Sequence, residues 1–173
     1  MFKSPKKGGK MTYGDLLLES LKAKSPEGNS RIHYPVDIVD SEVEIHADIC
    51  EVDRFGCQIE SLHLHRLGTP DENLSTRAHH LTDQATYLFE NLHLVECEPE
   101  RERALVRSAT VQNSGDSVGY YEADMHGDEV DFARFARNRR ERRREKIPFV
   151  LTKEAMARLV DDLAEAVGVH QEN

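Results

Sequence analysis

Residues 43–49 alternate apolar and polar side chains without interruption. The apolar members are Val43, Ile45, Ala47 and Ile49. Side chains two residues apart on a β-strand point to the same side of the sheet, so this period of two indicates a strand with one buried and one polar face. We therefore expect a sheet that is covered on one face.

A turn and a second strand are expected directly after this segment, with Ile59 on the apolar face. The apolar residues then change sides, to Leu62 and Leu64. A change of side within one strand predicts a β-bulge, here at Glu60 and Ser61.

Four more strands are expected between residues 92 and 132, joined by short turns. They span residues 92–97, residues 104–111, residues 118–125 and the segment around Val130 and Phe132. Proline at position 99 and glycine at position 127 suit tight turns between them. An edge strand is also expected over residues 32–38, because Pro35 cannot donate a hydrogen bond to a neighbouring strand.

Three helices are predicted, and the first and the last are recognised mainly by their caps. The first helix is expected to begin at Thr12, whose side chain suits an N-cap and which is followed three residues later by Asp15. The last helix is expected to begin at Thr152 and to end at Gly168.

The middle helix has the strongest apolar periodicity. Its apolar residues follow one another at spacings of four and three: Leu74, Ala78, Leu81, Ala85 and Leu88. Thr69 as N-cap, Pro70 at the first helical position and Glu72 three residues after the cap favour a start at residue 69. This helix is expected to end near Asn91.

The resulting order is helix, two or three strands, helix, four strands, helix. Strands grouped between helices and joined by short turns indicate an antiparallel sheet. We predict an α+β fold with about six or seven strands and with the helices packed on one face. A single domain over residues 11–170 would follow a disordered basic tail at residues 1–10.

The net charge of −9 combines regions of opposite sign. Residues 1–10 hold four lysines and no acid, and residues 134–146 hold eight basic residues against two acidic ones. The remaining 150 residues therefore carry a net charge of −19. Arginine and glutamate are good helix formers, so the segment 134–146 is predicted to be helical.

A metal site is one functional hypothesis. His63 and His65 are two apart on a predicted strand, so both imidazoles would lie on the same face and could reach one ion. A third ligand would have to come from His46, His93 or a carboxylate. A metal-dependent enzyme that uses His63 and His65 is therefore an alternative function.

Other motifs carry no recognisable chemistry. His79 and His80 are adjacent on a helix and diverge by about 100°. The segment 124–128 places its acids and histidine in one hairpin turn, whereas a metallophosphoesterase takes its ligands from separate loops. Three cysteines (Cys50, Cys57 and Cys97) are too few for a disulfide scaffold, so free thiols in a reducing compartment are expected.

The arginine-rich segment is the other candidate site. The candidate partner-binding residues are Arg137, Arg139, Arg140, Arg142, Arg143 and Arg144. Guanidinium groups bind carboxylates and phosphates, so the partner could be an acidic protein surface, a second copy of the chain or a nucleic acid. The acidic residues just upstream, among them Glu122 and Asp131, could pair with these arginines in the same or a neighbouring subunit. The acidic body disfavours nucleic acid.

We therefore expect a non-enzymatic protein-binding or adaptor module that forms a homo-oligomer. No catalytic residue and no cofactor is predicted. No apolar run approaches the roughly 20 residues that a membrane helix needs, and the leucine run at residues 16–18 is too short for the core of a signal peptide. A cytoplasmic location is expected.

Overall fold

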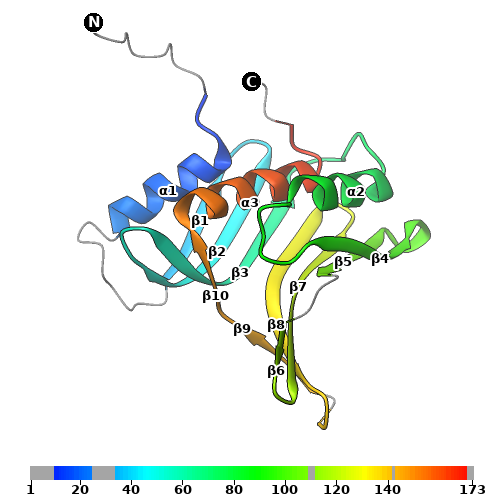
Figure 1. The fold of residues 1–173 in the computed structure, drawn as a ribbon. Coiled ribbons are helices and arrows are strands. Elements are labelled where there is room, and N and C mark those ends of the chain that lie inside the picture. The colour runs from blue at the N-terminus through cyan, green and yellow to red at the C-terminus, as the bar shows by residue number, and fades with distance from the viewer. Residues whose placement is uncertain (1–9, 25–33, 109–111, 142, 171–173) are drawn as a thin grey trace, which may run out of the picture.

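The computed structural model describes residues 10–24, 34–108, 112–141 and 143–170 (Figure 1). Over these residues the predicted α+β fold is confirmed. The helices are α1 (Tyr13–Lys24), α2 (Leu74–Gln84) and α3 (Lys153–Ala166), with a 3₁₀ turn η1 (Pro99–Arg101). The strands are β1 (Tyr34–Val39), β2 (Val43–Val52), β3 (Gly56–Arg66), β4 (Leu92–Glu98), β5 (Arg103–Ser108), β6 (Gln112–Ser114), β7 (Ser117–His126), β8 (Glu129–Asn138), β9 (Arg144–Ile147) and β10 (Phe149–Thr152). The expected basic tail lies outside the described residues except for Lys10.

Seven strands form the main path of the sheet, in the order β1-β2-β3-β8-β7-β5-β4. All of these neighbours are antiparallel, and the central pair β3 and β8 joins strands that come before and after α2 in the sequence. Three short strands complete the sheet: β10 pairs with β3, β9 with β8 and β6 with β7. The predicted strand count matches the main path.

All three helices cover the same face of the sheet (Figure 1). The apolar residues of β2 and β3 that face the helices, such as Ile45 and Leu64, are at most 3% exposed. The alternate residues of β2, such as Glu44, are exposed or half-buried on the opposite face. We call that opposite side the open face, because none of the described helices covers it.

The helices α1 and α3 pack backbone to backbone at Gly14. A Cβ atom added to Gly14 would lie 2.2 Å from the carbonyl oxygen of Ala157. The Gly14 N–H also donates to Asp161 Oδ1 of α3 at 2.8 Å. The predicted cap of α1 is present, since the Asp15 N–H donates to Thr12 Oγ1 at 3.1 Å.

Replacing Gly14→Ala should destabilise the fold by about 1–3 kcal/mol, because the added methyl group must push α1 away from α3. The free energy of unfolding from chemical denaturation measures the effect. Glu19→Ala, an exposed change on the same helix, is the control and should stay within about 0.5 kcal/mol of the wild type. Equal stability of Gly14→Ala and the wild type would contradict this close packing.

The helix α2 begins later and ends earlier than predicted. Its N-cap is Asn73, whose Oδ1 accepts from the Thr76 N–H at 2.9 Å, and not Thr69. Asparagine is as good an N-cap as threonine, so the caps alone did not decide between the two starts. The predicted apolar residues beyond Gln84 are still buried, since Leu88 is only 4% exposed.

Both the start and the end of α3 are as predicted. Thr152 caps its start by accepting from the Ala155 N–H at 3.1 Å. Gly168 follows the helix with a φ of +88°, a left-handed conformation that glycine adopts without strain.

The predicted β-bulge is confirmed in β3. Ser61 pairs with Asp48 and Ile59 pairs with Ile49, so Glu60 is the extra residue. The bulge lets Ile59 and Leu62 face the helices although they are three residues apart.

Both edges of the main sheet are interrupted. Pro35 lies in the edge strand β1, as predicted. At the other edge, the register of β4 shifts between Leu94 and Glu96, which makes Val95 a bulge residue that is 57% exposed.

The prediction of a helix over residues 134–146 is wrong. The segment continues β8 to Asn138, turns at residues 139–141 and returns as β9. Together with β6 and the start of β7, these strands form a projection from the body of the molecule (Figure 1). We call residues 112–119, 135–141 and 143–147 the arm.

Long-range ion pairs explain why this segment is extended. Arg134 points to the helix side of the sheet, where its Nη2 donates to Glu90 at 2.7 Å and its guanidinium lies 4.5 Å from the ring centroid of Tyr121. Both charged side chains are nearly buried. These contacts outweigh the small intrinsic helix preference of arginine.

Candidate functional site

Histidines and carboxylates from four strands meet on the open face. The register places His46 opposite both Asp37 and His63, and it places His65 opposite both Glu44 and Glu129. We call this group the histidine–carboxylate cluster. Its members are Asp37, Glu44, His46, Asp48, His63, His65, Asp128, Glu129 and Asp131. The cluster has six carboxylates, three imidazoles and no lysine or arginine, so it is anionic when the histidines are neutral.

His46 is held by a carboxylate on each ring nitrogen. Its Nδ1 lies 2.5 Å from Asp37 Oδ1, and its Nε2 lies 3.3 Å from Asp48 Oδ1. The hydrogen bond with Asp37 raises the pKa of His46 above its ordinary value.

His63 forms a cross-strand pair with Asp131 of β8. Its Nδ1 lies 2.9 Å from Asp131 Oδ1. This hydrogen bond raises the pKa of His63 and lowers the pKa of Asp131, so both groups favour their charged forms.

His65 lies between two carboxylates at longer distances. Its Nδ1 is 3.7 Å from Glu44 Oε2, and its Nε2 is 3.5 Å from Asp128 Oδ2. Ligand atoms of His65, Asp128 and Glu129 all lie within 4.8 Å of one another. Among the described residues, this is the group that has the spacing of a metal site.

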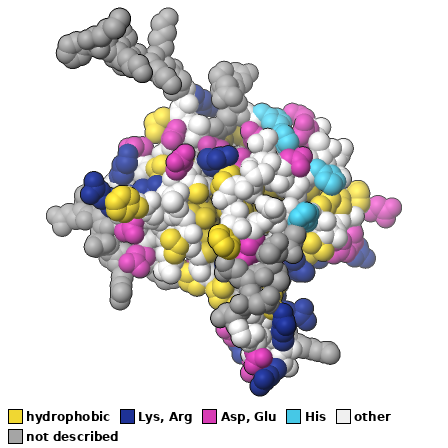
Figure 2. All heavy atoms as spheres, in the orientation of Figure 1, with side chains coloured by type: hydrophobic (Ala, Val, Ile, Leu, Met, Phe, Trp, Pro, Cys, Tyr) yellow, Lys and Arg dark blue, Asp and Glu magenta, His cyan; other side chains and the backbone are white. Residues whose placement is uncertain are grey.

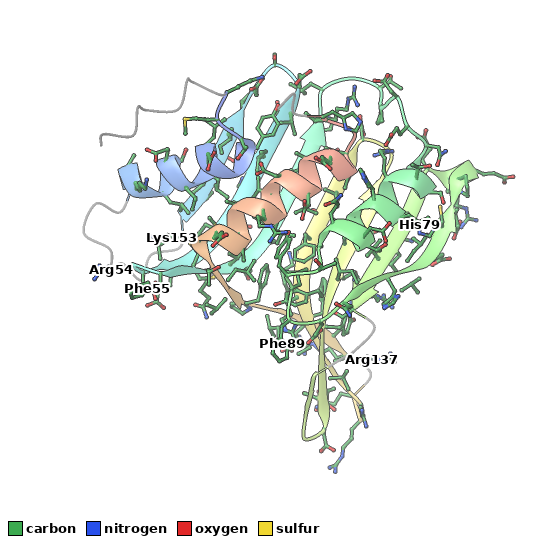
Figure 3. The ribbon with its side chains drawn as sticks, turned by 45° about the horizontal axis from the view of Figure 1, so that its top comes forward. Arg54, Phe55, His79, Phe89, Arg137 and Lys153 are labelled. Carbon is green, nitrogen blue, oxygen red and sulfur yellow. The ribbon has the colours of Figure 1, made fainter. Side chains whose placement is uncertain are left out.

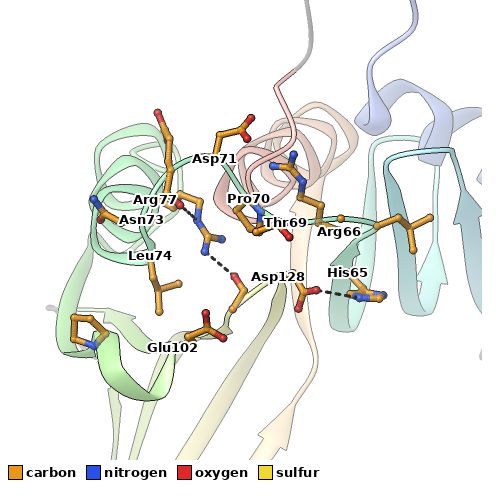
Figure 4. Close-up of a pocket in the computed structure, with 15 residues that line it drawn as sticks. His65, Arg66, Thr69, Pro70, Asp71, Asn73, Leu74, Arg77, Glu102 and Asp128 are labelled. Atoms are coloured by element: carbon orange, nitrogen blue, oxygen red, sulfur yellow. Dashed lines mark hydrogen bonds and ion pairs between the residues drawn. The ribbon is translucent and has the colours of Figure 1, made fainter.

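His65 and Asp128 also line a cleft of about 1000 Å³ at the same end of the sheet (Figure 4). The loop before α2, residues 66–73, forms one side, and Glu102 and Gly127 form another. The cleft therefore gives the ring of His65 access to solvent.

Arg77 forms part of the cleft wall but is a structural residue. Its guanidinium donates to the carbonyl oxygens of Glu72 at 3.2 Å, Gly127 at 2.6 Å and Ala166 at 2.8 Å. Burial lowers its pKa. Its bond to Ala166 places a cation at the C-terminus of α3, which the helix dipole favours.

A second polar group lies on the open face near the arm. The carboxylate of Glu122 is buried between Arg107 Nε, at 2.6 Å, and Arg144 Nη1, at 3.0 Å. Each guanidinium also covers an aromatic ring: Arg107 lies over Tyr120 and Arg144 over Phe135. The pairing of upstream acids with the arginine segment, which the sequence left open, is thus formed within one chain by Glu122 and Arg144.

The structure brings together most of the predicted metal candidates. His63 and His65 share one face as predicted, and His46 lies beside them. His93 is on the edge strand β4, opposite Arg107, and does not join the cluster. His79 lies exposed on α2, on the helix side of the sheet (Figure 3).

The candidate arginines lie on the arm, with one exception. Arg142 is outside the described residues. Arg140 and Arg143 have side chains 79% and 74% exposed, and they form ion pairs with the similarly exposed Asp116 and Glu145. Lys and Arg side chains are prominent on the arm (Figure 2).

No described helix has the length and the apolar character needed to cross a membrane. Comparison with known proteins finds no family model that matches the chain and no curated protein with significant sequence similarity. The chain's own geometry is therefore the basis on which its function can be inferred.

The pair of His63 and Asp131 predicts a pH-dependent contribution to stability. The pKa of His63 is raised above 6.5, so its contribution is present below that pH and is lost as the pH rises through the raised value. The pKa of Asp131 is lowered below 3.8, so its contribution is lost only in strong acid. Nearby Glu129, Lys146 and His126 add to these effects.

The substitution Asp131→Asn should therefore destabilise the protein more at about pH 5.5 than at about pH 8.5. The loss should stay below about 1 kcal/mol, because both side chains are more than one-third exposed. Urea denaturation at the two pH values measures it. Glu96→Gln, on the edge strand β4, is the control; a pH-independent loss in Asp131→Asn would contradict the ion pair.

Proposed function

We propose that the chain is a non-enzymatic protein-binding module that associates with a second copy of itself. In this association the arm of one copy docks on the histidine–carboxylate cluster of the other. The observation that carries the proposal is the charge complementarity between a cationic projection and an anionic sheet face on the same chain.

The arm is suited to contact another molecule. It projects from the body (Figure 1), and the charges at its tip are solvated, as the exposure of Arg140 and Arg143 indicates. Exposed charges of this kind add little to the stability of the fold. The position of these charges on the projecting arm favours a role in steering and selecting an anionic partner.

The histidine–carboxylate cluster offers the matching surface. Its carboxylates include Asp37 and Glu44, whose side chains are 64% and 50% exposed. A contact between two copies explains why one chain carries both surfaces, since each copy then supplies an arm and a face. No disulfide joins the three cysteines, which agrees with the cytoplasmic location that we propose for the module.

Nucleic acid is the less favoured partner for the arm. Proteins that bind single strands stack bases on accessible aromatic rings. Here Phe135 of the arm stacks on the neighbouring Tyr120, and the two rings are covered by the chain's own Arg144 and Arg107.

Reversing the charge of the arm should weaken self-association. We expect the double variant Arg140→Glu/Arg143→Glu to raise the dimer dissociation constant about tenfold or more, because attraction to the acidic face becomes repulsion. Sedimentation velocity and native mass spectrometry would measure the association. The reciprocal variant Asp37→Lys/Glu44→Lys, mixed with the arm variant, should restore a heterodimer.

The matched control is Lys22→Glu/Arg101→Glu, which makes the same change in net charge at exposed positions away from the arm. It should leave the dissociation constant unchanged. A monomeric wild-type protein, or an arm variant that associates as tightly as the wild type, would refute the proposal. Binding of single-stranded RNA that the arm variant loses would assign the arm to nucleic acid instead.

A further inference from the structure

We infer that His65, Asp128 and Glu129 form a binding site for one divalent transition-metal ion of the zinc class. This inference does not depend on self-association. The sequence predicted a metal site that uses His63 and His65. In the structure His63 is hydrogen-bonded to Asp131. The two ligands besides His65 are instead Asp128, in the turn between β7 and β8, and Glu129, the first residue of β8.

The spacing of the ligand atoms fits a metal ion better than it fits a hydrogen bond. Two ligands of a tetrahedral zinc ion, each about 2.0–2.2 Å from the metal, lie about 3.3–3.5 Å apart. His65 Nε2 and Asp128 Oδ2 are 3.5 Å apart, beyond the usual length of a hydrogen bond. A ligand atom of Glu129 lies within 4.8 Å of both, so the carboxylate of Glu129 must move closer when the ion binds.

The other ring nitrogen of His65 faces a carboxylate, the kind of group that commonly orients a metal-binding histidine. Its Nδ1 lies 3.7 Å from the carboxylate of Glu44 on β2, which is too far for a hydrogen bond. The negative charge at this position favours the tautomer with the proton on Nδ1, and that tautomer leaves Nε2 available to bind a metal. Glu44 is therefore a positioning residue for the site.

Regular backbone pairing fixes the protein part of the site. His65 lies directly opposite Glu129 in the register of β3 and β8. The next residue of β3, Arg66, donates its N–H to the carbonyl oxygen of Asp128 at 2.9 Å. The three ligands are thus held on adjacent strands and a two-residue turn, and not on a long loop.

The ligand types select the metal. One imidazole and two carboxylates suit Zn²⁺, Mn²⁺ or Fe²⁺, whereas Mg²⁺ and Ca²⁺ prefer oxygen ligands alone. Three protein ligands leave at least one coordination position for water. Because His65 and Asp128 line the cleft, the cleft provides a route by which the ion can enter.

Metal titration of the full chain tests the site. Protein stripped with a chelator would be titrated with Zn²⁺ by calorimetry and with Co²⁺ by visible absorption. We expect one equivalent to bind, with a Co²⁺ spectrum of nitrogen and oxygen ligands. His65→Ala, Asp128→Asn and Glu129→Gln should each weaken Zn²⁺ binding by about 100-fold or more, and Glu44→Gln by about 10- to 100-fold.

His93→Ala is the matched control, because His93 is exposed on β4 outside the histidine–carboxylate cluster and should leave the affinity unchanged. Thermal unfolding of each stripped variant establishes that it is folded. Absence of stoichiometric binding to the wild type would overturn the inference. So would equal loss in His93→Ala and His65→Ala, or a sulfur-to-cobalt charge-transfer band, which would place the ion on a cysteine.

Discussion

Burial of one sheet face under three helices is the constraint on which the rest of the molecule depends. Because side chains alternate along a strand, the residues between the core positions of β2, β3 and β8 must all project from the opposite face. That face carries no helix among the described residues, so most polar side chains on it keep contact with solvent, and the buried Glu122 is paired with two arginines. The close contact of Gly14 with Ala157 lets α1 and α3 lie side by side over the sheet.

The sequence was sufficient for those features that local periodicity encodes. Alternation predicted the strands, the bulge at Glu60 and the common face of His63 and His65. It did not reveal Asp128 and Glu129 as neighbours of His65, since more than sixty residues separate β3 from β8. Which distant strands pair is decided by packing of the whole core and not by a local pattern. Asp128 and Glu129 follow Gly127, a glycine typical of a hairpin turn, but the neighbouring sequence does not indicate which strand this hairpin would pair with.

The two errors in secondary structure have a shared cause. Thr69 and Asn73 are both suitable helix caps, and the arginine-rich segment has a composition that suits a helix. At both places the local preferences are weak, and for the arginine-rich segment contacts from distant residues decide the outcome. Glu90 and Glu122 pair with Arg134 and Arg144, and both arginines lie on extended strands. Weak local preferences are overridden when the alternative would leave such carboxylates buried and unpaired.

The interruptions at the two sheet edges have a consequence for solubility. An edge strand with a continuous row of amide and carbonyl groups is a template on which further chains can add, and repeated addition produces fibrils. Proline at position 35 removes one donor from the first edge, and the bulge at Val95 breaks the spacing of the second. Open-ended growth from either edge is thereby disfavoured, so a long antiparallel sheet can remain a discrete particle at high concentration.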